Sequence, residues 1–187
     1  MNSKKELRAH FLAQRLKLSP DEREAQSLKM ANQLLSLAVW DHQYFHMYLP
    51  IAQKAEPQTE FIMHVLQGRD KSIVLSKANF NDHTLQHLLL EDHTKIVLSA
   101  YGIPEPESGI SISPEQLDVV FVPLLAFDHE GYRLGYGKGF YDQFLSLCRP
   151  NCLKIGLSFF GPQPHLPRDS WDIPLDFVLT NDAVYRF

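Results

Sequence analysis

A nearly continuous apolar run, LDVVFVPLLAF at residues 117–127, constrains the fold more than any other feature of the sequence. A strand without a polar face is typical of the middle of a parallel sheet, where helices cover both sides. Four shorter apolar runs predict further strands, at residues 44–49, 72–76, 153–159 and 176–180. Helical patterns alternate with these strands, and the sequence therefore predicts an α/β sheet.

The first two helices are marked by their apolar spacing and by a capping motif. The helix predicted at residues 3–17 would turn four side chains inward: Leu7, Phe11, Leu12 and Leu16. Ser19, Pro20 and Glu22 form a capping box, which predicts a second helix that runs to about Ala38. The inward face of that second helix would carry Ala25, Leu28, Ala31, Leu34 and Leu35.

The remaining segments are less sharply defined. A short helix is expected between a Thr59 cap and a Gly68 stop, and another at residues 139–148. Residues 77–100 allow either short strands or helical turns. Residues 101–108, YGIPEPES, are rich in proline and predict a stiff loop.

Composition places the protein among globular proteins. It has 187 residues, of which 44% are hydrophobic and 21% charged, enough for one domain that spans residues 1–187. No apolar run approaches the roughly 18 residues that a membrane helix needs, so no membrane partner is expected. The charged segment at residues 1–17 lacks the apolar core of a signal peptide, and Glu6 argues against a transit peptide. We therefore expect a cytoplasmic protein.

The cysteines and histidines give only weak signals for a special site. Cys148 and Cys152 could form a disulfide or bind a metal, but free thiols in a reducing cytosol are favoured. His83, His87 and His93 are loosely spaced, and no further ligand is well placed to complete a metal site with them. These histidines are interpreted as core or surface residues.

The segment YRLGYGKGFYD, residues 132–142, directly follows the longest apolar run. Three glycines at alternate positions permit positive φ angles and a close approach of the backbone to a ligand: Gly135, Gly137 and Gly139. Successive N–H groups in such a loop can converge on an anion, and the start of the next helix adds partial positive charge. Arg133 and Lys138 supply cations, and Asp142 could reach a Mg²⁺ ion that bridges phosphate oxygens.

The position of this segment favours a phosphate-binding role. Ligands of open α/β sheets bind outside the carboxyl ends of the strands, which is where the segment falls. It is not a Walker loop, because Gly139 rather than Ser or Thr follows Lys138, and its spacing does not match the dinucleotide fingerprint. A plain glycine-rich turn between a strand and a helix is the alternative interpretation.

The stretch VPLLAFDHEGYRLGYGKGFYDQFL, residues 122–145, closely resembles the signature of the 5-formyltetrahydrofolate cyclo-ligases, also called 5,10-methenyltetrahydrofolate synthetases. Four shorter segments are similar to other motifs of that family: KKELR, AEPQT, GIPEP and WDIPLDFVLT. The resemblance covers essentially the whole sequence.

The resemblance implies a three-layer α/β/α sandwich with a mostly parallel central sheet, which is Rossmann-like and of the NagB/RpiA/CoA-transferase-like type. It also implies an enzyme that uses ATP and Mg²⁺ to convert 5-formyltetrahydrofolate to 5,10-methenyltetrahydrofolate, with release of ADP and phosphate. Phosphorylation of the formyl oxygen would make it a leaving group, after which N10 of the folate attacks the activated carbon. In such chemistry the protein mainly positions groups and neutralises charge.

The resemblance also implies which residues bind ATP. Lys4 and Arg8 match a pair that contacts the phosphates, and a helix places them on one face because they are four residues apart. The ATP-binding loop matches nine positions: Arg133, Leu134, Gly135, Tyr136, Gly137, Lys138, Gly139, Phe140 and Tyr141. Within this loop, Lys138 and Arg133 are the expected catalytic cations.

Two acidic positions match the metal ligands of the family. Asp142 is the last residue of the segment 132–142, and Asp172 lies in the motif SWDIP. Asp176 is a rival to Asp172 because the match there is short, although Asp176 could simply begin a strand.

Four residues match positions that contact the folate. Glu56 corresponds to a carboxylate that suits the paired N–H donors of a pterin-like ring, and Ile51 to an apolar contact. Tyr136 and Phe140 fall in the part of the loop that also touches folate. Phe140 stands where some relatives carry Tyr, so only stacking would remain, and Tyr136 stands where some carry Arg.

Two other function classes compete with the enzyme. A non-catalytic folate- or nucleotide-binding paralogue would keep the same cradle without turnover, although the intact charged residues argue against it. A nucleic-acid-binding protein could use the basic first helix. However, the net charge is −4 and the sequence lacks an aromatic-basic strand motif, so we expect no nucleic-acid partner. We expect a monomer that binds small molecules, including ATP and a folate that can carry a polyglutamate tail.

Overall fold

The computed structural model describes residues 3–187, and its centre is a seven-stranded sheet with the order β11-β10-β9-β6-β1-β2-β3. The strands are β1 (Tyr44–Met47), β2 (Ser72–Asn79), β3 (Thr84–Leu89), β6 (Val119–Val122), β9 (Leu153–Leu157), β10 (Phe177–Leu179) and β11 (Val184–Arg186). Neighbours pair in parallel except at the two edges, where β3 and β11 run antiparallel to their partners. The predicted sheet, mostly parallel, is confirmed.

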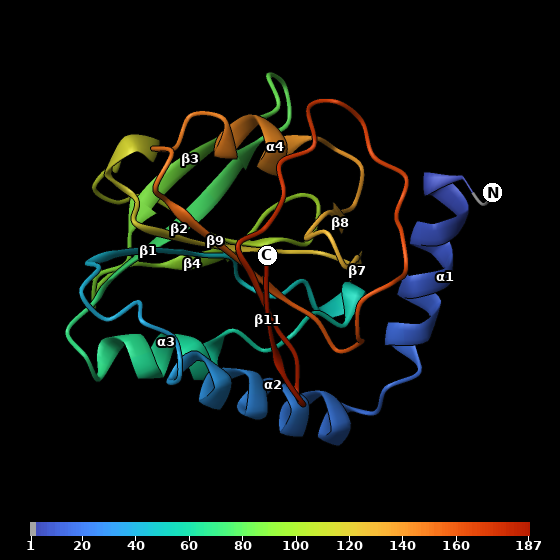
Figure 1. The fold of residues 1–187 in the computed structure, drawn as a ribbon. Coiled ribbons are helices and arrows are strands. Elements are labelled where there is room, and N and C mark those ends of the chain that lie inside the picture. Colours follow the sequence, from blue (N-terminus) through green and yellow to red (C-terminus); the bar gives the residue numbers. More distant parts are fainter. Residues whose placement is uncertain (1–2) are drawn as a thin grey trace.

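Helices cover both faces of this sheet (Figure 1). The helices α2 (Pro20–Leu34) and α3 (Glu60–Gln67) lie on one face, and the short helix α4 (Phe140–Leu145) lies on the other. The N-terminal helix α1 (Lys4–Leu16) stands to one side of the sheet. The arrangement confirms the three-layer α/β/α fold.

Alternate residues of the central strands build the two cores. In β1, Phe45 and Met47 join the core that contains residues of α2 and α3, whereas the His46 ring packs on Phe144 of α4. In β6, Val120 belongs to the core on the α4 side. Because the middle strands are buried on both faces, their sequences contain almost no polar residues.

The predicted central strand at residues 117–127 is broken in two. The strand β6 ends at Val122, because the next residue, Pro123, has no N–H group to continue the ladder. The chain then enters a small hairpin of β7 (Ala126–Phe127) and β8 (Arg133–Leu134). This hairpin places residues 135–139, here called the glycine segment, beside the end of the sheet.

The helix starts match the sequence analysis, but several buried positions do not. Ser3 and Ser19 each accept a hydrogen bond in a complete capping box. Four residues predicted to be buried are exposed instead: Leu16, Ala25, Leu28 and Leu35. In α1 the buried neighbour of Leu16 is Arg15, whose burial an apolar pattern cannot indicate. Thr59 begins α3 without a side-chain cap, since its hydroxyl donates to the carbonyl of Tyr48.

The segments that the sequence left open form strands. Residues 77–100 complete β2, form the hairpin partner β3, and include β4 (Ile96–Leu98). The strand β5 (Pro104–Pro106) pairs with β4, so the loop predicted at residues 101–108 is partly a strand. Single turns of 3-10 helix, η1 (Ala52–Lys54) and η2 (Pro114–Gln116), fill two connections. The helix predicted at residues 139–148 is shorter, because α4 ends at Leu145.

Two further predictions concern the state of the cysteines and the presence of membrane helices. Cys148 and Cys152 are free thiols, as predicted. Within residues 3–187, every helix is too short or too polar to cross a membrane.

A pair of histidines lies buried between the sheet and α4. His46 and His87 are almost fully buried, with ring centroids 5.2 Å apart, and both rings pack against Phe144. Among residues 3–187, neither ring nitrogen of His46 has a hydrogen-bond partner. Burial lowers the pKa of His46 well below its ordinary value and lowers the pKa of His87 to about 4. Both rings are therefore neutral at pH 7.

We expect the free energy of unfolding to fall by about 2 kcal/mol through His87 between pH 7.5 and pH 5. The folded pKa of about 4 lies below the unfolded value of 6.5, so the unfolded protein binds the proton first. The stabilisation is complete above pH 6.5 and is lost as the pH falls toward 4. Urea unfolding at both pH values should show a weaker pH dependence in His87→Leu. The control His93→Leu, at an exposed histidine, should keep the wild-type dependence, and an unaltered dependence in His87→Leu would contradict the prediction.

Candidate active site

A cavity of about 420 Å³ lies just beyond the ends of β1 and β6, where Tyr48 and Pro123 line it. All the site residues predicted from the sequence line this cavity: Lys4, Arg8, Ile51, Glu56, Arg133, Leu134, Gly135, Tyr136, Gly137, Lys138, Gly139, Phe140, Tyr141, Asp142 and Asp172. They come from α1, from the loop after β1, from the segment that runs from β8 into the first turn of α4, and from the loop before β10. The fold thus brings together segments that are far apart in the sequence.

The glycine segment forms one wall, and its conformation depends on α1. Gly137 and Gly139 have φ angles of 83° and 77°, which favour glycine, whereas Gly135 has no positive φ. A Cβ at Gly137 would lie 2.7 Å from Cζ of Arg8, while one at Gly139 would meet nothing within 4 Å. Arg8 also donates from Nε to the carbonyl of Gly135 at 2.9 Å. Because α4 has only six residues, anion binding here would depend on the loop rather than on a helix dipole.

The predicted cations differ in their surroundings. Arg133 donates to a carboxylate oxygen of Asp142 at 2.7 Å and to the carbonyl of Ile173 at 2.6 Å, which fixes its guanidinium. Lys4 pairs with Asp169 and Asp172 at 2.7 and 2.8 Å. Burial lowers the pKa of Lys4, but the two carboxylates more than offset this effect and raise it above its ordinary value. Lys138 is exposed at the cavity.

The two predicted metal ligands both face the cavity, and each is already engaged by a cation. The hydrogen bonds to Asp142 from residues 3–187, from Arg133 and the Ile173 amide, both end on Oδ1. Asp172 accepts from Lys4. The rival Asp176 is not part of the cavity lining, because it pairs with Lys154 at 2.8 Å and accepts from its backbone amide.

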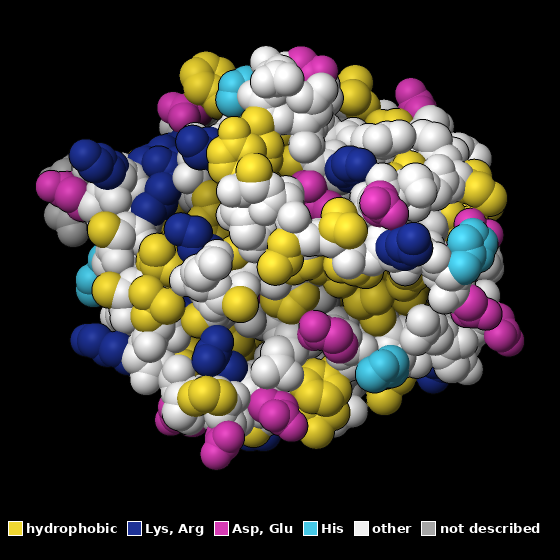
Figure 2. All heavy atoms as spheres, turned by 180° about the vertical axis from the view of Figure 1, so that it is seen from behind, with side chains coloured by type: hydrophobic (Ala, Val, Ile, Leu, Met, Phe, Trp, Pro, Cys, Tyr) yellow, Lys and Arg dark blue, Asp and Glu magenta, His cyan; other side chains and the backbone are white. Residues whose placement is uncertain are grey.

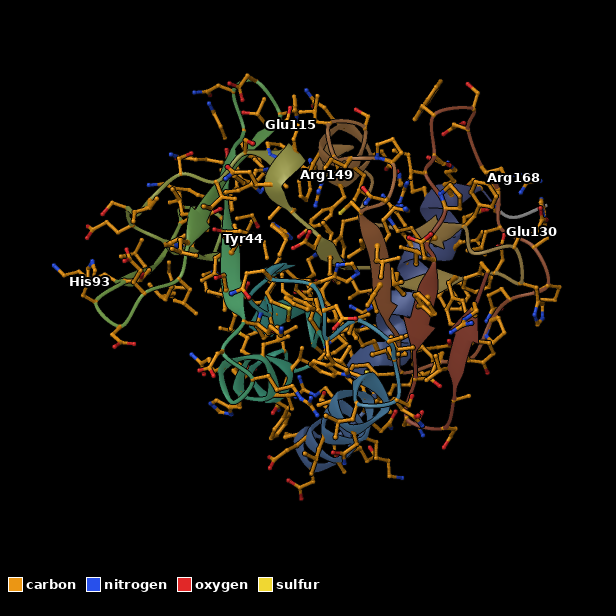
Figure 3. All side chains as sticks on the ribbon, turned by 60° about the vertical axis from the view of Figure 1, so that its left-hand side comes forward. Tyr44, His93, Glu115, Glu130, Arg149 and Arg168 are labelled. Atoms are coloured by element: carbon orange, nitrogen blue, oxygen red, sulfur yellow. The ribbon has the colours of Figure 1, made fainter. Side chains whose placement is uncertain are left out.

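A cluster of Asp128, Glu130 and His165 lies outside the cavity and is structural. Asp128 is fully buried and accepts hydrogen bonds from the amides of Glu130, Tyr132 and Leu166, which hold two loops together. Glu130 pairs with Arg168 at 2.7 Å, and the two lie side by side at the edge of the molecule (Figure 3). Of the three histidines interpreted as core or surface residues, His87 is buried and His83 and His93 are exposed.

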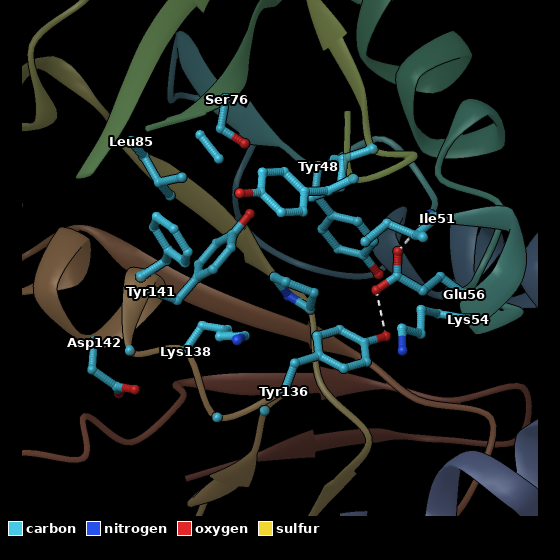
Figure 4. A pocket seen from close by; sticks show the side chains of 18 of the residues that line it. Tyr48, Ile51, Lys54, Glu56, Ser76, Leu85, Tyr136, Lys138, Tyr141 and Asp142 are labelled. Carbon is cyan, nitrogen blue, oxygen red and sulfur yellow. Dashed lines mark hydrogen bonds between the residues drawn. The ribbon is translucent and has the colours of Figure 1, made fainter. Parts of the chain in front are cut away.

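Glu56 is a buried carboxylate, 4% exposed, with a protein donor on each oxygen. The amide of Ile51 donates to Oε2 at 2.7 Å, and the Tyr136 hydroxyl donates to Oε1 at 2.5 Å (Figure 4). Burial raises the pKa of Glu56, while these hydrogen bonds and the charge of Arg15 oppose the rise. Burial also raises the pKa of Tyr136. A carboxylate with this support can accept further N–H donors from a ligand.

Sequence reasoning missed several residues of the site. Arg15 donates to the Tyr136 hydroxyl at 2.9 Å from within the core, and the apolar spacing of α1 gives no sign of it. Tyr48, Ser76 and Tyr141 also line the cavity (Figure 4). Tyr48 is the last residue but one of the strand predicted at residues 44–49, so only its position near a strand terminus could have indicated a role.

An aromatic group closes one side of the cavity. Phe80 stacks on Tyr101 with ring centroids 3.9 Å apart and meets Phe140 edge-on at 5.1 Å. The turns at Phe80 and Tyr101 and the first residue of α4 supply these rings, so spacing within the sequence could not reveal the group. On the face seen in Figure 2, Lys and Arg side chains gather toward the side of α1. The site therefore combines an apolar, aromatic part with a basic part.

We expect Gly137→Ala to destabilise the protein more than Gly139→Ala. Both substitutions force alanine into a positive φ, which costs about 1 kcal/mol or more. Only Gly137→Ala also drives a methyl group into the Arg8 guanidinium, which must then move and give up its hydrogen bond to Gly135, so its loss of unfolding free energy should be larger by about 1 kcal/mol. Urea unfolding of the two variants checks this order, and equal losses would show that Arg8 does not press on the loop.

Comparisons with known proteins agree with this arrangement. The model of the 5-formyltetrahydrofolate cyclo-ligase family matches residues 1–181. A 5-formyltetrahydrofolate cyclo-ligase of Mycoplasma genitalium is 41% identical over 75 residues, which are 40% of this chain and 46% of that protein. One of Mus musculus is 29% identical over 198 residues, covering 97% of this chain and 95% of that protein.

The fold agrees as well. The NMR structure of the Aquifex aeolicus 5,10-methenyltetrahydrofolate synthetase superposes with a TM-score of 0.84 at 35% identity, over 98% of this chain and 92% of that one. Since the family model matches nearly every residue, the chain belongs to the 5-formyltetrahydrofolate cyclo-ligase family and is an enzyme of the ligase class.

Proposed function

We propose that this enzyme uses ATP and Mg²⁺ to convert 5-formyltetrahydrofolate to 5,10-methenyltetrahydrofolate, with release of ADP and phosphate. The observation that most supports this proposal is that one cavity contains two chemically different parts. The glycine segment and its cations form one part, and the buried carboxylate of Glu56 with its aromatic neighbours forms the other.

The glycine segment suits the phosphates of ATP. Open space beside Gly135 and Gly139 lets a ligand approach the backbone closely. Arg8, Arg133 and Lys4 supply fixed positive charge, and exposed Lys138 can reach toward a terminal phosphate. We assign Lys138 and Arg133 to neutralising the charge that develops during phosphoryl transfer.

Asp142 and Asp172 fit a Mg²⁺ ion that is held mostly by phosphate. Mg²⁺ in nucleotide sites usually takes one or two carboxylates, with water and phosphate oxygens as its other ligands. Both carboxylates face the cavity next to the proposed phosphate-binding cations. The ion would neutralise phosphate charge and orient the terminal phosphate.

Glu56 suits the donor edge of the folate ring. Each oxygen accepts one protein donor and has a second lone pair, so a ring with two adjacent N–H groups can bind both oxygens at once. Ile51 and Phe140 would supply apolar contacts to the ring. This arrangement would turn the formyl group toward the glycine segment.

The reaction balances with these components. The formyl oxygen attacks the terminal phosphorus of ATP, and ADP leaves. N10 of the folate then attacks the formyl carbon, the C–O bond breaks with release of phosphate, and the N10 proton is lost to solvent. The protein holds the two substrates in line and excludes water from the activated carbon.

We also propose that the enzyme works as a monomer in the cytoplasm. The two free thiols suit a reducing compartment. Gel filtration with light scattering tests the monomer, for which a stable dimer would be the contrary result.

The purified enzyme should produce the absorbance of the methenyl product when given 5-formyltetrahydrofolate, ATP and Mg²⁺. Omission of ATP, or chelation of Mg²⁺, should abolish the signal. If the protein binds both substrates without forming product, it is a non-catalytic relative, and the proposal is wrong.

We expect Lys138→Ala to raise the KM for ATP at least about tenfold while the Kd for 5-formyltetrahydrofolate changes by less than about twofold. Lys138 is exposed, so the free energy of unfolding should stay within about 0.5 kcal/mol of wild type. Lys5→Ala, at an exposed lysine outside the cavity lining, is the matched control and should leave both constants unchanged. An equal loss of ATP and folate binding would count against the assignment.

A further inference from the structure

Arg15 is a buried cation without a direct ion pair among residues 3–187. Its side chain lies at the end of α1 and the residue is 2% exposed. It donates from Nη1 to the Tyr136 hydroxyl and from Nη2 to the carbonyl of Leu124. A buried guanidinium is costly unless a negative charge compensates it. The compensating charge is Glu56, which Arg15 reaches through Tyr136.

The direction of these hydrogen bonds is fixed by chemistry. A guanidinium has only donors, so the Tyr136 oxygen must accept from Arg15. The one proton of the Tyr136 hydroxyl is then free to point to Glu56, which must accept it. Since Ile51 also donates to Glu56, the protein presents this carboxylate as a pure acceptor.

We propose that Arg15 is a positioning residue for folate binding, which acts through the Tyr136 hydroxyl to keep the Glu56 carboxylate ionised and oriented. This inference rests on the proposed role of Glu56 as the acceptor for the folate ring. Arg15 does not line the cavity and would not touch the substrate. Its effect on binding is transmitted by one hydroxyl group.

Other groups near Glu56 cannot replace Arg15. The titratable and charged groups that face Glu56 are Arg15 from α1, Lys54 from η1, Tyr48 after β1, and Tyr136 and Tyr141 from the glycine segment and α4. Three of these are neutral phenols whose pKa values burial raises. Lys54 is the other cation, and its Nζ sits 5.9 Å above the ring of Tyr136. Arg15 is therefore the cation that is linked to Glu56 by hydrogen bonds.

The first test measures Glu56 itself, without any ligand. Carbon-13 NMR titration of labelled glutamate carboxyls gives the pKa of Glu56 in wild type, Arg15→Met and Arg15→Lys. We expect Arg15→Met to raise it by at least about one unit, because the carboxylate loses its compensating charge. Arg15→Lys keeps the positive charge, so the pKa of Glu56 in this variant should stay close to the wild-type value. An unchanged pKa in Arg15→Met would overturn the proposal.

The second test measures 5-formyltetrahydrofolate binding against pH. We expect Arg15→Met to weaken binding at least about tenfold at pH 7.5 and to move the loss of affinity at low pH to a higher pH. In turnover, the KM for folate should rise while kcat stays within about threefold. A merely structural role would lower thermal stability without moving the pH midpoint, and that result would also overturn the proposal.

Tyr136→Phe tests whether the hydroxyl carries the effect. In the Tyr136→Phe background, Arg15→Met should weaken folate binding by less than about threefold, because the link is already broken. If the two substitutions instead weaken folate binding by independent factors that multiply, transmission through Tyr136 is contradicted. If Arg15→Met does not fold, Tyr136→Phe alone decides, since it should raise the pKa of Glu56 and weaken folate binding.

Arg23→Met is the matched control. Arg23 lies on α2 outside the cavity lining. Its Nε, like that of Arg15, is buried without a partner among residues 3–187. It should change neither the Glu56 pKa nor folate affinity. If wild type fails to bind 5-formyltetrahydrofolate, the proposed function falls, whereas the ligand-free titration still decides whether Arg15 controls Glu56.

Discussion

The end of β6 at Pro123 is the constraint on which the site depends. Because proline cannot donate to a sheet ladder, the central strand stops and the chain leaves the sheet. The hairpin of β7 and β8 then carries the glycine segment back across the ends of the parallel strands. The cavity forms where this segment faces the loop that holds Glu56. A strand that continued to residue 127 would have left no room for it.

The helix α1 is fastened to this region by polar contacts as well as apolar ones. Phe11 packs with Leu125 and Leu134 of the hairpin region. Arg8 and Arg15 reach backbone carbonyls and the Tyr136 hydroxyl beyond that contact. The N-terminal helix is thus part of the site although it lies apart from the sheet. Its register along the hairpin sets the shape of the glycine segment.

Much of the fold and the candidate site could be predicted from the sequence, because local signals were strong. Capping boxes mark both N-terminal helices, and the glycine segment follows the longest apolar run. Apolar spacing failed at four exposed positions: Leu16, Ala25, Leu28 and Leu35. In α2 the buried stripe runs through Ser27 and Met30, so it is rotated from the face that the apolar residues alone suggested. The burial of Arg15 could not be predicted from the sequence, because a charged side chain is buried only where tertiary partners compensate it. Asp172 could be separated from Asp176 only by the fold, which turns Asp176 to Lys154.

The ion pairs of the cavity have a consequence for how charge enters it. Arg133 with Asp142, and Lys4 with Asp172, leave these four side chains without net charge in the empty protein. A polyphosphate that arrives with its divalent counter-ion would exchange partners with these pairs, the anion taking the cations and the metal taking the carboxylates. Such an exchange adds little uncompensated charge at any stage. In the proposed function, it would favour metal-chelated nucleotide over the bare anion.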